Sequence, residues 1–182
     1  MDHKDTTKDT AVVNKLILLY FMDKMDVAMT ESSILKACYY ENAWLEYVDC
    51  ISTLHQLEEN GFLFRTMHEK VSYFSITPDG RDCISNFYSR VASSIRTHIA
   101  EFVKENRLTI RRRQEYSTSY QLNPDRSYSV ILKIVDPTNP TRITMDLKFV
   151  VPNKQTAKAV AERWNTHAPK VYSMIYEQLV EE

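Results

Sequence analysis

The side chains that could perform nucleophilic or metal chemistry do not occur at the spacing that such chemistry needs. The chain has three cysteines, Cys38, Cys50 and Cys83, and none belongs to a C-x-x-C pair. His55 lies five residues after Cys50, but no second pair of ligands follows at the spacing of a zinc finger. We therefore expect no metal site, and we interpret the cysteines as small apolar core residues in a reducing compartment.

A catalytic set is also missing from the sequence. Cys83 and His98 are far apart in the chain and have no identifiable third residue to orient them. Asp79 and Asp82 lie at a predicted helix start, where acidic side chains interact favourably with the helix dipole. The chain has only 2 glycines, so it lacks a glycine-rich phosphate loop. We expect no enzymatic activity, no catalytic residue and no cofactor.

Two other groups of side chains could contact a ligand. The three arginines at 111–113 form the main basic cluster, and on a predicted strand only the first and third would face the same way. They are interpreted either as charges that protect an edge strand, which we favour, or as a nucleic-acid or anion site. The aromatic residues Tyr116, Tyr120 and Tyr128 either line a pocket on the predicted sheet or, more commonly for such residues, pack in the core.

The elements that must position these residues begin with three predicted helices. The first covers residues 10–25 and is apolar on nearly every side, which indicates burial on more than one side. The second covers about residues 30–40 and can be capped by Thr30. The third covers about residues 44–59 and ends at Asn60-Gly61, where glycine suits the left-handed position after a helix.

A hairpin and a further helix follow. Residues 62–66 and 71–76 read as short strands joined by a four-residue loop. Thr77-Pro78-Asp79 then has the cap, the proline and the acid of a helix start. This helical pattern continues to about residue 106, with a kink expected near 92–94.

The second half of the chain changes to the period of β-strands. Residues 109–114, 116–122, 128–135 and 143–151 read as four strands, and the last alternates apolar and polar side chains. This alternation predicts an antiparallel sheet that is covered on one face only. Two C-terminal helices follow, with a break at 167–169. The expected fold is α+β: a winged helix-turn-helix at 10–93, then a domain at 94–182 with a connecting helix, a four-stranded antiparallel sheet and C-terminal helices.

Several stretches resemble a known family. Residues 54–63 (LHQLEENGFL) and 73–81 (YFSITPDGR) resemble bacterial winged-helix transcription regulators. The opening NKLILLY at 14–20, ITPDG at 76–80, and VPNKQTA at 151–157 with Trp164 resemble the bacterial domain-of-unknown-function family 4364. This resemblance covers about residues 10–180. It implies a winged-helix half joined to a sheet-and-helix half, and it implies no established activity.

The resemblance to winged-helix regulators implies a DNA-binding surface. In such proteins the third helix enters the major groove and the hairpin, called the wing, touches the backbone or the minor groove. Carried over by position, the base readers would be Ser52, Thr53 and Gln56, and the wing contacts would be Arg65, His68 and Lys70. Lys4, Lys8 and Lys36 would add phosphate contacts. We expect a dimeric DNA-binding transcription regulator.

The charge distribution opposes this prediction and keeps an alternative open. Residues 1–90 carry 9 Lys and Arg against 14 Asp and Glu, a net charge of −5, whereas residues 91–182 carry 14 against 10, a net charge of +4. The predicted third helix carries four acids (Glu46, Asp49, Glu58 and Glu59) and no Lys or Arg. Such a surface repels phosphate. The alternatives are a winged-helix module that binds protein without DNA affinity, and a small-molecule-binding protein built on the C-terminal sheet.

The remaining expectations concern location and assembly. The longest apolar run, Leu16 to Met22, has seven residues, whereas a membrane span needs roughly 20. With no signal peptide recognisable, we expect a cytoplasmic protein that does not enter the membrane. The all-round apolar first helix and the apolar last helix lead us to expect a homodimer. A protein or small-molecule effector would bind the C-terminal domain.

Overall fold

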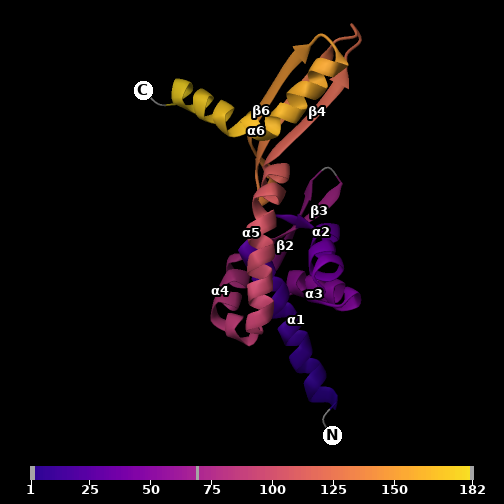
Figure 1. Cartoon of the computed structure of the whole chain (residues 1–182), viewed down its shortest axis with the longest axis vertical. Coiled ribbons are helices and arrows are strands. Elements are labelled where there is room, and N and C mark those ends of the chain that lie inside the picture. Colours follow the sequence, from indigo (N-terminus) through magenta and orange to yellow (C-terminus); the bar gives the residue numbers. More distant parts are fainter. Residues whose placement is uncertain (1–2, 69, 181–182) are drawn as a thin grey trace. The chain divides into compact units, whose positions relative to one another are not determined.

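The structure is a computed structural model that describes the backbone of residues 3–68 and 70–180, with side chains from residue 9 onward (Figure 1). The described chain divides into two compact units, Met1–Leu108 (unit 1) and Thr109–Glu182 (unit 2). The boundary predicted from the sequence lies earlier, between residues 93 and 94. Helix α5 (Ser93–Glu115) begins in unit 1 and ends in unit 2.

Unit 1 combines helices with a small antiparallel sheet. Its elements before α5 are α1 (His3–Met25), β1 (Met29–Thr30), α2 (Glu31–Leu35), the π-helical η1 (Lys36–Glu41), α3 (Tyr47–Glu59), β2 (Leu63–His68), β3 (Val71–Ile76), α4 (Pro78–Phe87) and the 3-10 helix η2 (Tyr88–Arg90). The strands lie in the order β1-β3-β2 and every pairing is antiparallel. Mixed α and β structure agrees with the predicted α+β class.

Helix α1 forms the centre of the unit 1 core. Side chains around its whole circumference are buried, including Leu16, Leu18, Leu19 and Phe21. Helices α3 and α4 and strand β3 pack around it, and in Figure 1 the two helices lie on either side of α1. Burial on more than one side, predicted from its composition, is confirmed. Because the chain covers these residues by itself, they do not require a second copy.

Local signals of the sequence determine where several elements begin and end. The Thr30 hydroxyl accepts a hydrogen bond from the Ser33 amide at 3.2 Å and caps α2. Gly61 follows α3 with φ of 75°, the left-handed conformation that glycine adopts readily. The Thr77 hydroxyl accepts from the Gly80 amide at 3.0 Å and donates to the Gly61 carbonyl at 2.8 Å. Thr77 thereby ties the start of α4 to the end of α3.

Unit 2 is a sheet covered on one face by a long helix. The antiparallel order is β4 (Tyr116–Leu122), β5 (Tyr128–Asp136) and β6 (Asn139–Val151), followed by α6 (Lys154–Leu179). Asn153 caps α6 by accepting from the Thr156 amide at 2.9 Å. The core side chains Val130, Leu132 and Ile134 alternate along β5 and pack with Trp164. The predicted one-sided sheet is confirmed in this arrangement.

The prediction of a fourth strand at 109–114 is wrong. These residues form the last turns of α5, and the sheet has three strands in the described part of the chain. Adding residues to an existing helix is easier than starting a new element, and arginine and glutamine are good helix formers. On a helix, successive arginines at 111–113 point about 100° apart. Arg111 pairs with Glu115 at 3.3 Å, one helical turn later.

The prediction of two C-terminal helices is also wrong. One helix, α6, runs from Lys154 to Leu179 with Pro169 inside it. Proline removes one hydrogen bond and bends a helix without necessarily ending it. Figure 1 shows α6 changing direction, so that its C-terminal part leaves the sheet. The helix predicted for 77–106 is interrupted by η2 close to the expected kink, and α5 starts anew at Ser93.

We predict that Gly80→Ala destabilises unit 1. Helix propensity alone predicts a gain of about 1 kcal/mol. However, an alanine Cβ would collide with the Phe62 carbonyl and lie 2.9 Å from Cγ1 of Ile76. We therefore expect urea denaturation to show a loss of about 1–3 kcal/mol in the free energy of unfolding. The exposed control Asn86→Ala should change it by less than about 0.5 kcal/mol. A higher unfolding midpoint for Gly80→Ala would contradict the prediction.

Candidate nucleic-acid interface and a polar pocket

Helix α3 presents two of its three predicted base readers at the surface. Ser52 is exposed and Gln56 is half-buried, whereas Thr53 is only 5% exposed and belongs to the core. The reason is that α3 packs both against α1 and against α2 and β2, which widens its buried face beyond Cys50 and Leu54. The Gln56 side-chain amide donates to the Ser52 hydroxyl at 2.9 Å. The surface available to a base is therefore the Ser52–Gln56 pair.

The β2–β3 hairpin carries the predicted wing residues. Strand β2 extends to His68, which pairs with Val71, so the connection is shorter than the predicted four-residue loop. Glu69 lies outside the described residues. Lys70 is exposed with φ of 67°, as tight two-residue hairpins require. His68 is half-buried near the hairpin end. The hairpin tip therefore presents the charge of Lys70 to solvent.

The third wing residue, Arg65, is engaged by the acidic helix beside it. Its Nε lies 2.9 Å from an oxygen of Glu58 on α3. His55 approaches the same carboxylate at 3.7 Å and Glu31 at 3.4 Å. These contacts join α2, α3 and the hairpin. They also neutralise Arg65, so the wing offers less positive charge than its sequence suggests.

Other predicted phosphate contacts add little to this surface. Lys36 lies 3.5 Å from Glu41. The side chains of Lys4 and Lys8 lie outside the described residues. Three acids of the α3 region, Glu46, Asp49 and Glu59, are exposed. The acidic α3 surface that the charge count predicted is therefore present.

An aromatic surface near the start of α3 did not enter the sequence interpretation. Tyr40 and Val48 are 70% and 72% exposed, and Tyr47 is also exposed. The Tyr39 ring contacts the rings of Tyr40 and Tyr47, with centroids 4.9 and 5.7 Å away. The sequence signal for this surface was the Tyr39-Tyr40 pair before the predicted turn and the Tyr47-Val48 pair after it. Clusters of exposed aromatic side chains are common where proteins bind each other.

The residues considered for catalysis have structural partners. Cys38 and Cys50 are buried free thiols, and the hydrogen bond that the Cys38 thiol donates to Cys50, together with burial, raises the pKa of Cys38 well above its usual range. Burial also raises the pKa of the half-buried Cys83. His98 Nδ1 lies 3.4 Å from the indole nitrogen of Trp44, which donates to it. Within the described residues, no group of three His, Cys, Asp or Glu side chains could hold a metal.

Two of the three tyrosines considered as pocket residues on the sheet belong to its packing. Tyr116 and Tyr128 are partly buried against the core of unit 2. Tyr120 contacts the Tyr128 ring edge-on, with centroids 6.3 Å apart. The interpretation as core packing agrees with Tyr116 and Tyr128, whereas Tyr120 is 37% exposed.

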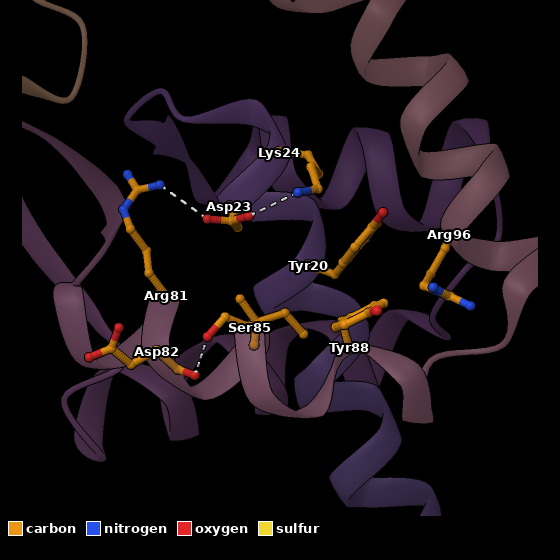
Figure 2. A pocket seen from close by; sticks show the side chains of 9 residues that line it. Tyr20, Asp23, Lys24, Arg81, Asp82, Ser85, Tyr88 and Arg96 are labelled. Atoms are coloured by element: carbon orange, nitrogen blue, oxygen red, sulfur yellow. Dashed lines mark hydrogen bonds and ion pairs between the residues drawn. The ribbon is translucent and has the colours of Figure 1, made fainter.

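A polar pocket in unit 1 was not predicted from the sequence (Figure 2). Its volume is about 480 Å³, and its lining comes from α1, α4, η2 and α5: Tyr20, Asp23, Lys24, Arg81, Asp82, Ile84, Ser85, Tyr88 and Arg96. These residues come from three separate stretches of the chain. No spacing rule in the sequence links them, because only the packing of α4 and α5 beside α1 gathers them.

The comparisons with known proteins give a family and no activity. The sequence model of a domain of unknown function (DUF4364) matches residues 14–179, so the chain belongs to this family. No curated protein and no solved structure matches it. Among the residues that the structure describes, no helix combines the length and hydropathy of a membrane span.

Proposed function

We propose that unit 1 of this DUF4364 protein is a winged-helix module that binds DNA, and that the chain is a transcription regulator. The observation that carries the proposal is the succession of α2, α3 and the β2–β3 hairpin, with β1 paired to β3. In winged-helix regulators, the helix corresponding to α3 enters the major groove and the hairpin contacts the DNA backbone. Exposed Ser52 and Lys70 on these two elements support this assignment.

The base-reading chemistry would come from the Ser52–Gln56 pair. A glutamine amide can donate to N7 and accept from the N6 amino group of adenine in one bidentate contact, and a serine hydroxyl can serve several bases. Gln56 Nε2 donates to the Ser52 hydroxyl at 2.9 Å. This hydrogen bond fixes the orientation of the Gln56 amide group, including its oxygen. The two side chains would therefore read DNA together rather than independently.

The phosphate-binding chemistry would be weak. Lys70 is exposed at the wing tip, and Arg65, which is also exposed, contributes only when it separates from Glu58. The salt slope is the slope of the logarithm of the binding constant against the logarithm of the salt concentration. Two neutralised phosphates give a salt slope of about −2, much shallower than that of strongly basic repressors. Discrimination between sequences would then depend mainly on the base contacts, each worth about 1–3 kcal/mol.

A selection of bound fragments from random DNA at low salt tests the proposal. We expect Lys70→Ala to weaken binding to all sequences alike and to reduce the salt slope by about 1. We expect Gln56→Ala to relax the preference at one base position. Two outcomes would contradict the proposal: the selection enriches no fragment, or binding survives both substitutions and is lost when the arginines at 111–113 are neutralised.

We further predict that Glu58→Gln strengthens DNA binding. The substitution frees the Arg65 guanidinium from a carboxylate 2.9 Å away and removes one negative charge from α3. The added phosphate contact should raise affinity at low salt by about threefold to tenfold and make the salt slope steeper by about 1. Glu59→Gln is the matched control, because this exposed neighbour removes the same charge without releasing Arg65. Equal effects of the two variants in fluorescence-anisotropy titrations would argue against Arg65 as a contact.

Binding to a protein is the second candidate function. The observation that favours it is the exposed aromatic surface of Tyr40, Tyr47 and Val48 beside the acids of α3. Apolar anchors with an acidic border suit a basic protein partner and repel phosphate. If the DNA selection enriches no fragment and the Glu58→Gln variant also binds no DNA, this function is favoured over DNA binding.

We also predict that the chain forms a homodimer through the end of α6. Tyr172, Tyr176 and Leu179 recur at helical spacing on one side of α6, and all three are exposed. An apolar helix stripe of this kind is commonly covered by a second copy. Light scattering at micromolar concentrations should give a dimer mass, and Tyr176→Glu with Leu179→Glu should give a monomer mass. Gln178→Glu, on the other side of the helix, is the control. A monomer mass for the unsubstituted chain would refute the dimer.

A further inference from the structure

The polar pocket of unit 1 has the size and lining of a small-molecule site. Its volume of about 480 Å³ lies within the usual range of ligand pockets, about 300–1,000 Å³. The lining contains three cations, two acids and two tyrosines. The kind of ligand that the pocket can accept depends on which of these charged side chains are already paired within the protein.

One wall of the pocket is an ion-pair network that is complete without a ligand. The Asp23 carboxylate lies 3.1 Å from Arg81 and 3.3 Å from Lys24 (Figure 2). The Arg81 guanidinium also pairs with Asp26, and Arg107 lies 3.3 Å from the other oxygen of Asp26. This wall therefore holds its charges by internal pairing and keeps α1, α4 and α5 together.

Arg96 on the other wall is not matched by an acid. Its Nε donates to the Val91 carbonyl at 3.1 Å, and its Cζ lies 5.2 Å from the centroid of the Tyr88 ring. Among the described residues, no Asp or Glu forms an ion pair with it. Within the described residues its two Nη groups form no hydrogen bond, since only Nε is used. The two Nη groups of Arg96 can therefore bind an anion end-on.

The space beside Arg96 is bounded by aromatic rings. Figure 2 places Tyr20 and Tyr88 between Arg96 and the Asp23–Arg81 pair. Lys24 lies over the Tyr20 ring, 5.3 Å from its centroid, and its ammonium pairs with Asp23. The Asp82 carboxylate points away from both rings in the same view and does not neutralise the pocket. Rings of this kind favour a flat apolar body.

We infer that this pocket binds a small aromatic carboxylate. The carboxylate would accept paired hydrogen bonds from the Nη groups of Arg96, a geometry that guanidinium and carboxylate share. The ligand ring would contact Tyr20 and Tyr88. The site belongs to unit 1, whereas the sequence led us to expect an effector on the C-terminal domain. It does not depend on the proposed DNA binding.

Titration of the full chain with benzoate, followed by amide resonances in NMR spectra, tests this inference without DNA. Benzamide is the matched neutral probe, because it keeps the ring and removes the charge. We expect benzoate to give saturable shifts at residues that line the pocket at concentrations up to about 10 mM, as for a millimolar ligand. Benzamide should give little or no shift.

Two substitutions separate the charge from the ring contacts. Arg96→Gln should weaken benzoate binding about tenfold or more, since it removes a charge-assisted hydrogen-bond pair. Tyr88→Leu removes the ring and should also weaken binding. It serves as the second pocket variant if Arg96→Gln does not fold. Arg163→Gln, an exposed arginine on α6, should leave the affinity unchanged. The inference is overturned if benzoate gives no saturable shifts, if benzamide acts equally, or if the folded pocket variants keep the original affinity.

Discussion

The need to enclose helix α1 determines how unit 1 is built. Its residues Leu16 to Met22 are buried apart from the half-buried Tyr20, and full burial of each large apolar side chain contributes about 1.5–3 kcal/mol. No single neighbour can cover a helix that is apolar all round, so α3, α4 and β3 pack against it together. This packing brings the start of α4 so close to Phe62 that position 80 has no room for a Cβ. The same packing determines which side of α3 is exposed to solvent.

The contacts that hold the hairpin against α3 also shape its chemistry. Glu58 binds Arg65 and lies near His55, which in turn approaches Glu31. Ion pairs of this partly exposed kind contribute little stability each, but they connect three elements. They also neutralise Arg65, a positive charge of the hairpin that DNA binding would need. The proposed DNA contact therefore competes with an internal pairing, and the exposed tyrosines near the start of α3 offer a surface suited to protein.

The pocket depends on the same helix. Tyr20, Asp23 and Lys24 come from the end of α1, Arg81 and Tyr88 come from α4 and η2, and Arg96 comes from α5. Asp23 and Asp26 anchor the arginines that reach them from α4 and α5. Arg96 instead takes a backbone carbonyl and a ring as partners. An unpaired guanidinium is left in the pocket because the acids at the end of α1 are used elsewhere.

Short-range patterns of the sequence determined the element ends and the faces of the sheet. Thr30, Thr77 and Asn153 cap their helices and Gly61 ends α3, because each effect depends on residues within one helical turn. The family was also evident from local stretches, and the comparison confirmed it. Only the tertiary structure decided that Thr53 is buried and that α6 passes through Pro169. It also decided which cations are paired. These features depend on which surfaces meet, and distances between residues far apart in the chain are not encoded in any local period or propensity.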